Sequence, residues 1–598
     1  MSRRGTSRTI IAVVVIVVII VASVGVYLLS RPSSGPSMTT VQTSAISGGT
    51  LSVDESGEPE GLDPGFDYDP PAWDVMPNIF QGLLWYNGSS TDTFVPVLAQ
   101  SWTVSADGMT YTFQLRSNVT FSNGDPFNAY VMWYSILRAV LMNQGPSWIL
   151  AQNIGAGNIT DSMLNSMSYA TPTSAQIAVM SASSNGVQVL DPHTLQFNLG
   201  HGFNGPNPYP GFLATLTVPT AAAVDPAVIT ANGGVKAGQS NTWALSNPIG
   251  TGQFVLNAWN RGDSIILTKN PTYWGNNLAQ SNMNAEVAPA KLDKVIIYYK
   301  ADDLTRELDI KSGAVQSAYV DYSRLGDVNG TQGIVVQKLG LITSINWVYM
   351  KENVFPFNIT NVREAIAYAI DTQGIINEAF AGLATKFVGP LFQGMPGYDP
   401  TIPPYSYDPA KAKELLADAG FPGGKGLPVI RFLYLSSSDE DAKAAQIIQA
   451  NLNDIGISVE LVGEVWSVYA SMQTDPTAAA TAPTMGLTHW SADYMSPDDY
   501  TVPIASASGF LMQYLSSYNN TKLNGLVFGA SIENDPAKRN QMYSQIAQIM
   551  YNDYVNIWLY QRQGYAVYRE GVQGIVFNPL GATLFYTHTY AQIYLTSM

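Results

Sequence analysis

The chain contains no cysteine, only four histidines and few charged residues. Charged residues make up 12% of the 598 positions, about half of the roughly 25% usual in soluble proteins. The absence of cysteine excludes disulfides, thiolate zinc sites, iron–sulfur clusters and cysteine nucleophiles. The histidines (His193, His201, His489 and His588) are scattered along the chain, so few imidazole ligands are available for a metal site. We therefore expect no cofactor.

The charge balance also argues against a nucleic-acid partner. The formal net charge is −16, whereas phosphate binding needs clustered lysine and arginine. With so few charges, the polar surface must consist mainly of Ser, Thr, Asn, Gln and Tyr. Such a surface is typical of an extracellular protein, including one that works in acid.

The N-terminus contains a segment that is long enough to cross a membrane. Residues 10–29 form an uncharged run rich in Ile and Val, and Arg3, Arg4 and Arg8 precede it. A helix of about 20 such residues spans a hydrocarbon core, and the arginines place residues 1–9 in the cytoplasm. We therefore expect a transmembrane anchor at 10–29, with a Ser/Thr/Pro-rich tether at 30–49. The alternatives are a cleaved secretory signal and a pilin-like leader cut near Gly5.

Beyond the tether, the local patterns change along the chain. Residues 110–116 alternate with period two, which predicts a strand. Residues 141–245 are rich in Gly, Asn, Ser and Pro, and predict a loop-rich insertion. From about 344 onwards strands and helices alternate; the clearest helix starts at Asp408-Pro409 and ends at Gly420. A further helix is predicted over about 439–454, between strands at 427–434 and 457–462. This alternation indicates a sheet covered by helices.

Nine segments, in this order, resemble one family. The family is the extracytoplasmic solute-binding protein of peptide-type ABC transporters (family 5, the oligopeptide/dipeptide/nickel-binding cluster), and the anchor suggests an archaeal-type, membrane-attached member. The matching segments are GLDP (61–64), NIFQGLLWY (78–86), PVLAQSWTVSADGMTYTFQLRSNVTFSNGDPFNA (96–129), NPIGTGQFVLNAW (247–259), NPTYWG (270–275), LDKVIIYY (292–299), VREAIAYAID (362–371), YDPAKAKELLADAGF (407–421) and WSADYMSPDDY (490–500).

The resemblance implies an α/β fold of the two-lobed periplasmic-binding-protein type (class II, with an extra domain), with mixed sheets, flanking helices and a hinge between the lobes. On that pattern, lobe one combines residues 50–76, 245–343 and 560–598. An additional domain, 77–244, packs on lobe one, and lobe two is 344–559. The two chain crossings that would serve as the hinge are expected near 343–346 and 556–561.

The resemblance also implies a function. Such proteins are not enzymes: they capture a solute between their lobes, close around it, and hand it to the ABC permease, with which cytoplasmic ATPase subunits work. We expect a monomer on the outer face of the cell membrane. Six Asn-x-Ser/Thr triplets could carry glycans: Asn87, Asn118, Asn158, Asn329, Asn358 and Asn519.

The expected ligand is a short peptide whose amino terminus meets an aspartate. The family's aspartate falls in the motif Trp490-Ser-Ala-Asp493-Tyr494, and Trp490 and Tyr494 are candidate ligand-binding residues beside Asp493. A carboxylate suits an enclosed ammonium, because an unpaired buried charge is costly. The opposing reading is that Asp493 caps a turn. His489, which precedes the motif, is a weaker candidate because a buried strand histidine is an ordinary core residue.

The opposite wall is expected directly after the GLDP motif. Tyr68, Asp69 and Trp73 are the candidates there, and Trp148 lies where family members place an aromatic residue at the rim of the cleft. Ordinary loop packing is the alternative for each. Since flat aromatic faces also suit sugar rings, an oligosaccharide remains a competing ligand. A structural cell-surface glycoprotein is the alternative from another class.

Overall fold

A computed structural model describes residues 48–597 apart from 183, 185, 203 and 582–587. The predicted cytoplasmic tip, the transmembrane anchor and nearly all of the tether lie outside these residues. Within the described ranges, no helix combines the length and the apolar character that a membrane crossing requires.

The largest sheet contains eleven strands. Its path runs β15 (Val459–Glu464), β14 (Ile430–Leu435), β16 (Met485–Trp490), β12 (Ile334–Met350), β17 (Asn556–Arg569), β11 (Ser317–Ala318), β1 (Thr50–Glu55), β10 (Lys294–Tyr299), β9 (Ser264–Lys269) and β8 (Phe254–Asn260), and β13 (Ala384–Lys386) pairs with β17.

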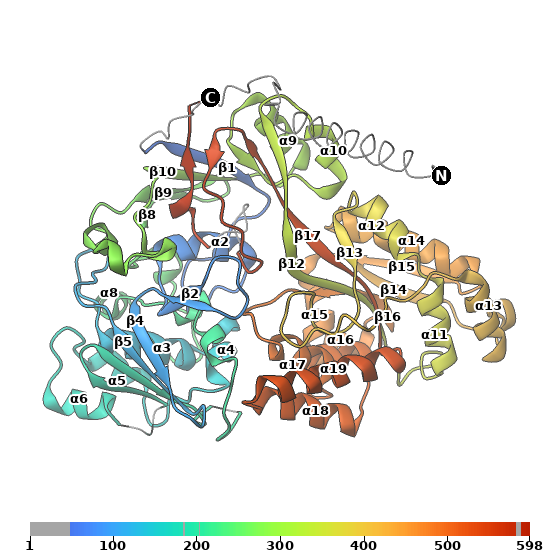
Figure 1. The fold of residues 1–598 in the computed structure, drawn as a ribbon, viewed down its shortest axis with the longest axis horizontal. Helices are drawn as coiled ribbons and strands as arrows, with labels where there is room; N and C mark the ends of the chain where they lie inside the picture. The colour runs from blue at the N-terminus through green and yellow to red at the C-terminus, as the bar shows by residue number, and fades with distance from the viewer. Residues whose placement is uncertain (1–47, 183, 185, 203, 582–587, 598) are drawn as a thin grey trace, which may run out of the picture. The chain divides into compact units, whose positions relative to one another are not determined.

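Two long antiparallel strands, β12 and β17, connect the two ends of this sheet (Figure 1). Their register shifts between Lys338 and Leu341 and again between Leu341 and Ile345. Such irregularities bend a strand pair and break its ladder locally. Both predicted crossings, near 343–346 and 556–561, fall on these strands. The domain boundaries built on the crossings stay predictions.

On one side of this pair, β14 runs parallel to both β15 and β16. The carboxyl ends of the three strands therefore meet at one edge, which is where open α/β sheets usually bind ligands. Helix α14 (Asp439–Asp454) packs on β14 and β15, with Ser438 as its N-cap. The predicted helix at 408–420 is confirmed as α13 (Pro409–Asp418), where the Asp408 carboxylate accepts from the Lys411 N–H at 3.0 Å.

A separate four-stranded sheet, in the order β4-β5-β7-β6, lies within the range predicted for the additional domain. Its strands are β4 (Ala99–Val104), β5 (Thr110–Leu115), β6 (Val187–Asp191) and β7 (Thr194–Asn198), and β2 (Leu84–Tyr86) pairs with β3 (Phe94–Pro96) nearby in sequence. The strand predicted at 110–116 is thus confirmed. Helix α3 (Ala129–Met142) contacts β6 and β7.

The prediction of a loop-rich insertion at 141–245 is wrong in part. The segment forms the β6–β7 hairpin and several short helices: α4 (Trp148–Ala151), α5 (Asp161–Ser166), α6 (Ser174–Met180), α7 (Phe212–Thr215) and α8 (Pro226–Ala231). Several of its polar residues serve as N-caps of these helices. Thr160, Thr173 and Asp225 each accept a hydrogen bond from the first turn of a helix, which satisfies backbone donors that would otherwise lack partners.

The remaining elements complete the described chain. They are α2 (Pro70–Ile79), α9 (Asp303–Ser312), α10 (Leu325–Val328), α11 (Thr360–Ala369), α12 (Thr372–Ala379), α15 (Trp466–Thr474), α16 (Pro476–Thr481), α17 (Asp498–Ala505), α18 (Thr521–Ile532), α19 (Pro536–Asn552), β18 (Val572–Gln573) and β19 (Tyr594–Leu595).

Candidate functional site

The loop between β16 and α17 carries Asp493, and its carboxylate meets a side chain from the other end of the chain. The hydroxyl of Tyr68 donates a hydrogen bond of 2.5 Å to Asp493 Oδ2. Tyr68 precedes α2, and Asp493 follows the carboxyl end of β16. The structure thus joins the two walls that the sequence predicted separately.

Two tryptophans extend the wall around Tyr68. The indole N–H of Trp148 donates to the Tyr68 hydroxyl at 3.4 Å, and the ring of Trp73 lies 6.1 Å from that of Tyr68. Burial and the nearby Asp493 carboxylate raise the pKa of Tyr68 well above its ordinary value, so its hydroxyl stays protonated. Its side chain nevertheless keeps 39% of its accessible surface, as a residue on the wall of a cleft does.

Asp493 lies at the edge of a pocket of about 500 Å³, measured to its opening into solvent. Its lining is mostly apolar and aromatic, with Asp493 as its one carboxylate. The lining residues are Trp73, Met76, Pro77, Phe80, Gly82, Trp85, Thr217, Val218, Pro219, Ala222, Asp493, Leu580, Gly581 and His588.

The electrostatics of Asp493 suit a partner with a positive charge. Burial raises the pKa of Asp493 to about 7, although the hydrogen bond from Tyr68 works against that shift. Its backbone N–H donates to Asp499 Oδ2 at 3.1 Å, which fixes the loop. A cation placed against the carboxylate would restore the charged form that burial disfavours.

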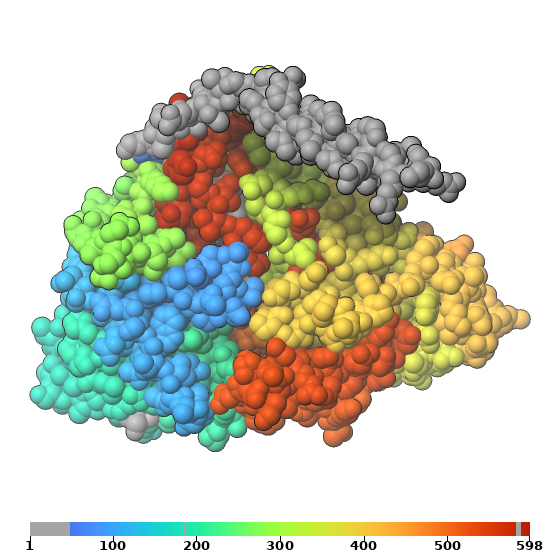
Figure 2. All heavy atoms as spheres, viewed as in Figure 1, coloured from blue at the N-terminus to red at the C-terminus, as the bar shows by residue number. Residues whose placement is uncertain are grey.

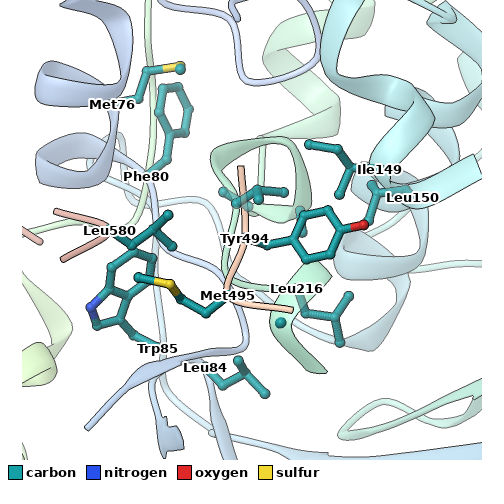
Figure 3. Packing of buried hydrophobic residues seen from close by; sticks show 14 of the residues in the cluster. Met76, Phe80, Leu84, Trp85, Ile149, Leu150, Leu216, Tyr494, Met495 and Leu580 are labelled. Carbon is teal, nitrogen blue, oxygen red and sulfur yellow. The ribbon is translucent and has the colours of Figure 1, made fainter. Parts of the chain in front are cut away.

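Two residues of the Trp-x-x-Asp-Tyr motif face away from the pocket. The Trp490 indole donates to Asp499 Oδ2 at 3.4 Å. Tyr494 is buried, and its ring packs 6.2 Å from that of Trp148. Figure 3 shows Tyr494 and Met495 among apolar side chains that come from α2, β2 and α4, together with Leu216. Both aromatic residues hold the loop in place.

Two further sequence candidates have other partners. Asp69 caps helix α2: its Oδ1 accepts from the Ala72 N–H at 2.6 Å, and its Oδ2 accepts from the Glu60 N–H at 3.0 Å. His489 lies in β16 opposite Asn346. Burial and the nearby Arg562 guanidinium lower the pKa of His489 to about 3, so its ring is neutral. Neither residue lines the pocket.

The C-terminal region supplies pocket residues that sequence reasoning missed. The ring of His588 stacks on Trp85 with centroids 3.6 Å apart and planes 5° apart, and His588 Nδ1 lies 2.7 Å from Glu286 Oε2. Trp85 and Phe80 belong to the NIFQGLLWY segment, whose aromatic residues were a usable signal. Nothing local in the sequence marks Leu580 or His588. Among the described residues, no group of three His, Cys, Asp or Glu side chains could hold a metal ion.

Two hydrogen bonds away from the pocket also join residues before 250 to residues after 390. The hydroxyl of Thr91 donates to the Gly394 carbonyl at 3.3 Å. In Figure 2 the blue surface of early residues and the gold surface of later residues touch. The amide of Asn534 donates to the Asp107 carbonyl at 3.0 Å. Residues before 250 and residues after 390 therefore contact each other at places other than the pocket.

The chain matches a known family model and is similar to several named proteins. The model, described as bacterial extracellular solute-binding proteins, family 5 (middle), matches residues 93–511. A probable D,D-dipeptide-binding periplasmic protein of Escherichia coli K12 is 24% identical over 92% of this chain and 95% of its own. Heme-binding protein A of Haemophilus influenzae is 26% identical over 93% and 95%, respectively.

A solved structure covers nearly the same length. It is a periplasmic binding protein from Helicobacter pylori in complex with the peptide STSA, with 25% identity, a TM-score of 0.69, and coverage of 92% of this chain and 98% of that one. The structural matches confirm the predicted α/β fold of the two-lobed periplasmic-binding-protein type.

Proposed function

The chain belongs to family 5 of the bacterial extracellular solute-binding proteins, and from that premise we propose that its solute is a short peptide. The protein would capture the peptide outside the cell and deliver it unchanged to the permease of an ABC importer. The observation that carries this proposal is the Asp493 carboxylate at the edge of a largely apolar pocket, hydrogen-bonded to Tyr68.

The chemistry of the pocket supports a ligand with one cationic end. An ammonium buried without a counter-charge would cost several kcal/mol, so it needs a carboxylate within hydrogen-bonding distance. Asp493 offers that carboxylate, and Trp73, Trp85 and Phe80 offer apolar faces for side chains. In this proposal Asp493 holds the amino terminus, Tyr68 orients the carboxylate, and Trp73 and Trp148 form the wall. Trp490 and Tyr494 position the loop without touching the ligand, and Asp69 and His489 take no direct part.

Similar proteins support a peptide ligand without fixing it. The Escherichia coli relative is described as binding a D,D-dipeptide, and the Helicobacter pylori structure contains a tetrapeptide. The Haemophilus influenzae relative is described as binding haem. The aromatic lining would also accommodate a sugar, which keeps an oligosaccharide as the alternative ligand.

Ligand capture would proceed by closure of the lobes about the β12–β17 pair. The irregular register of that pair gives a place where a few residues could absorb the rotation. A ligand that touches Asp493 on one side and the α2 region on the other would favour the closed state. It can do so only by its difference in affinity for the closed over the open form.

The site of action follows from the family and from the N-terminal sequence. Family members are extracellular, and we propose that residues 10–29 anchor this chain, as a monomer, to the cell membrane with its globular part outside. All six Asn-x-Ser/Thr asparagines are exposed, so glycosylation of each would be sterically possible. Recovery of the protein in the culture medium without detergent would contradict the anchor.

Calorimetry with a ligand panel tests the proposal. Di- to octapeptides, oligosaccharides of similar mass and hemin would be titrated into the purified full chain. We expect 1:1 binding of one or more peptides, and weaker or no binding of the same peptides after N-acetylation. Binding of sugars or hemin alone would contradict the peptide proposal and leave the family assignment unchanged.

A further inference from the structure

A second carboxylate lies directly behind Asp493. Asp499, in the first turn of α17, retains 1% of its accessible surface. Its Oδ2 accepts hydrogen bonds from the Asp493 N–H at 3.1 Å and from the Trp490 indole at 3.4 Å. Asp499 therefore touches the backbone that carries the proposed amine-binding carboxylate, without lining the pocket itself.

One oxygen of Asp499 has no hydrogen-bond partner. Asp499 Oδ1 is fully buried and receives no donor within the described residues. A buried carboxylate oxygen without a donor is unfavourable when charged. A proton on this carboxyl removes the charge and so lowers that cost. No lysine or arginine of the described chain forms an ion pair with Asp493 or Asp499 that would make the proton unnecessary.

The surroundings of the two carboxyls also favour a bound proton. Burial raises the pKa of Asp499 well above its ordinary value, and the nearby Asp493 and Asp498 raise it further. Several titratable groups face the pair. The segment that carries the pair contributes Tyr494, Asp498 and Tyr500. The others are Tyr68 before α2, Tyr86 in β2, Tyr209 through its contact with Asp498, and His588 across the pocket.

None of these neighbours is a lysine or an arginine. The tyrosines stay neutral because burial raises the pKa of each. Asp498 accepts hydrogen bonds from the hydroxyls of Tyr209, Tyr494 and Ser496, which favour its charged form, although burial raises its pKa above the ordinary value. His588 is engaged with Glu286 at 2.7 Å.

We propose that the Asp493–Asp499 pair carries one proton in the ligand-free protein, and that the ligand's ammonium displaces this proton when it binds. This inference rests on the proposed function, because it assigns the proton to the same amine site. The protonated pair and a ligand R–NH₃⁺ give the complex of two carboxylates with R–NH₃⁺, and one proton passes to the buffer. Asp499 is thus a positioning residue that makes capture of a cationic end depend on pH.

The first test needs no ligand. Infrared difference spectra between the full chain and Asp499→Asn, both at about pH 8, report which species the substitution removes. Aspartic acids ordinarily titrate near 3.9, so an ordinary carboxyl would appear only as a carboxylate at that pH. We expect the variant to lose the carbonyl band of a protonated carboxyl. Loss of carboxylate bands alone would overturn the inference.

Asp54→Asn is the matched control for this measurement. Asp54 is equally buried, and burial raises its pKa to about 7, so at about pH 8 it is mostly ionised. Its replacement should therefore remove carboxylate bands. If Asp499→Asn, like Asp54→Asn, removed only carboxylate bands, the Asp493–Asp499 pair would carry no proton and the inference would be wrong.

The second test counts the protons released on binding. Trialanine, tetraalanine and pentaalanine would be titrated at about pH 8 in two buffers of different ionisation enthalpy. The wild-type chain should release about one proton more per bound peptide than Asp499→Asn, since proton uptake by the peptide amine is the same for both. Equal proton counts would overturn the inference and leave the proposed function standing. Absence of peptide binding, with the infrared result as expected, would contradict the proposed function alone.

Discussion

The hydroxyl of Tyr86 accepts a hydrogen bond of 2.8 Å from the backbone N–H of Met495, which lies 409 positions further along the chain. Both groups are buried. Tyr86 ends strand β2, and Met495 follows the candidate amine-binding residue by two positions. The contact therefore ties the Asp493 loop to the part of the chain that carries the other wall of the pocket.

Tyr86→Phe should weaken peptide binding more than it weakens the fold. It leaves the Met495 N–H buried without an acceptor, at a cost of about 1–3 kcal/mol, and that cost falls on the closed state if the lobes part in the free protein. Tyr111→Phe is the control, because its hydroxyl bonds to the Tyr209 carbonyl at 3.3 Å within the predicted additional domain. Calorimetry and urea unfolding would separate the two effects. Equal losses of affinity for both variants would contradict the closure argument.

Asp493→Ala should weaken binding of a free peptide by about 2–5 kcal/mol, the usual cost of removing one partner of a buried charge pair. The same substitution should barely change the weak binding of the N-acetylated peptide. The wild-type and Asp493→Ala chains, each with the free and the N-acetylated peptide, form a cycle that isolates the ammonium–carboxylate contact. Additive effects would show that Asp493 serves the loop and not the amine.

The stability of the protein should rise as the pH falls from about 8 to about 5. Burial raises the pKa of Asp54, Glu55 and Asp441 to about 7 in each case, whereas the unfolded chain titrates near 4. The folded state therefore binds more protons in this window, and each such carboxyl lowers the free energy of unfolding by up to about 1.4 kcal/mol per unit rise in pH. This contribution is complete below about pH 4 and is lost as the pH rises through 7.

His489 acts in the opposite direction. Its folded pKa is lowered to about 3, so its contribution is lost as the pH falls below about 6.5, where the unfolded imidazole takes up a proton. One such group opposes several carboxyls, so we expect the net slope to keep its sign down to about pH 5. Urea unfolding at several pH values measures it, and a free energy of unfolding that rises with pH would contradict the assignment.

The buried ion pair between Arg138 and Asp63 should be essential to the fold. Arg138 Nη1 and Nη2 lie 2.8 and 2.5 Å from the two Asp63 oxygens, and both side chains are 1% exposed. Arg138→Met leaves the Asp63 charge buried and alone, which costs about 3–5 kcal/mol. Lys411→Met, which removes the exposed pair with Glu414, should barely change the stability, because solvent screens such a pair. Urea unfolding measures the free energy of unfolding of both variants, and equal losses for Arg138→Met and Lys411→Met would contradict the prediction.

Local signals in the sequence predicted the elements that depend on local chemistry. Helix α14 spans residues 439–454, the predicted range, because Ser438 caps it and its apolar positions repeat with helical period. In contrast, residues 141–245 carry polar caps and turn residues without a long period, so the short helices there and the β6–β7 pairing went unrecognised. Their partners, such as β5, lie about 80 positions earlier in the chain.

The site divided in the same way. The family resemblance located Asp493 and the Tyr68–Trp73 segment, and the structure brings them together. The resemblance alone did not predict that Tyr494 points into the core while Asp493 borders the pocket, because neighbouring residues in a loop share no fixed direction. His588 was out of reach for another reason: only the folded chain stacks it on Trp85, some 500 positions away.

Closure upon ligand binding is the central claim, and a distance across the cleft tests it most directly. The chain lacks cysteine, so spin labels at Ala106→Cys and Ala537→Cys report a single pair. Both sites are exposed and lie beside the contact between Asn534 and Asp107. Pulsed electron paramagnetic resonance should give a broad distribution with long distances for the free protein. A peptide shown by calorimetry to bind should collapse it to one short distance. A distribution that this peptide leaves unchanged would contradict the account.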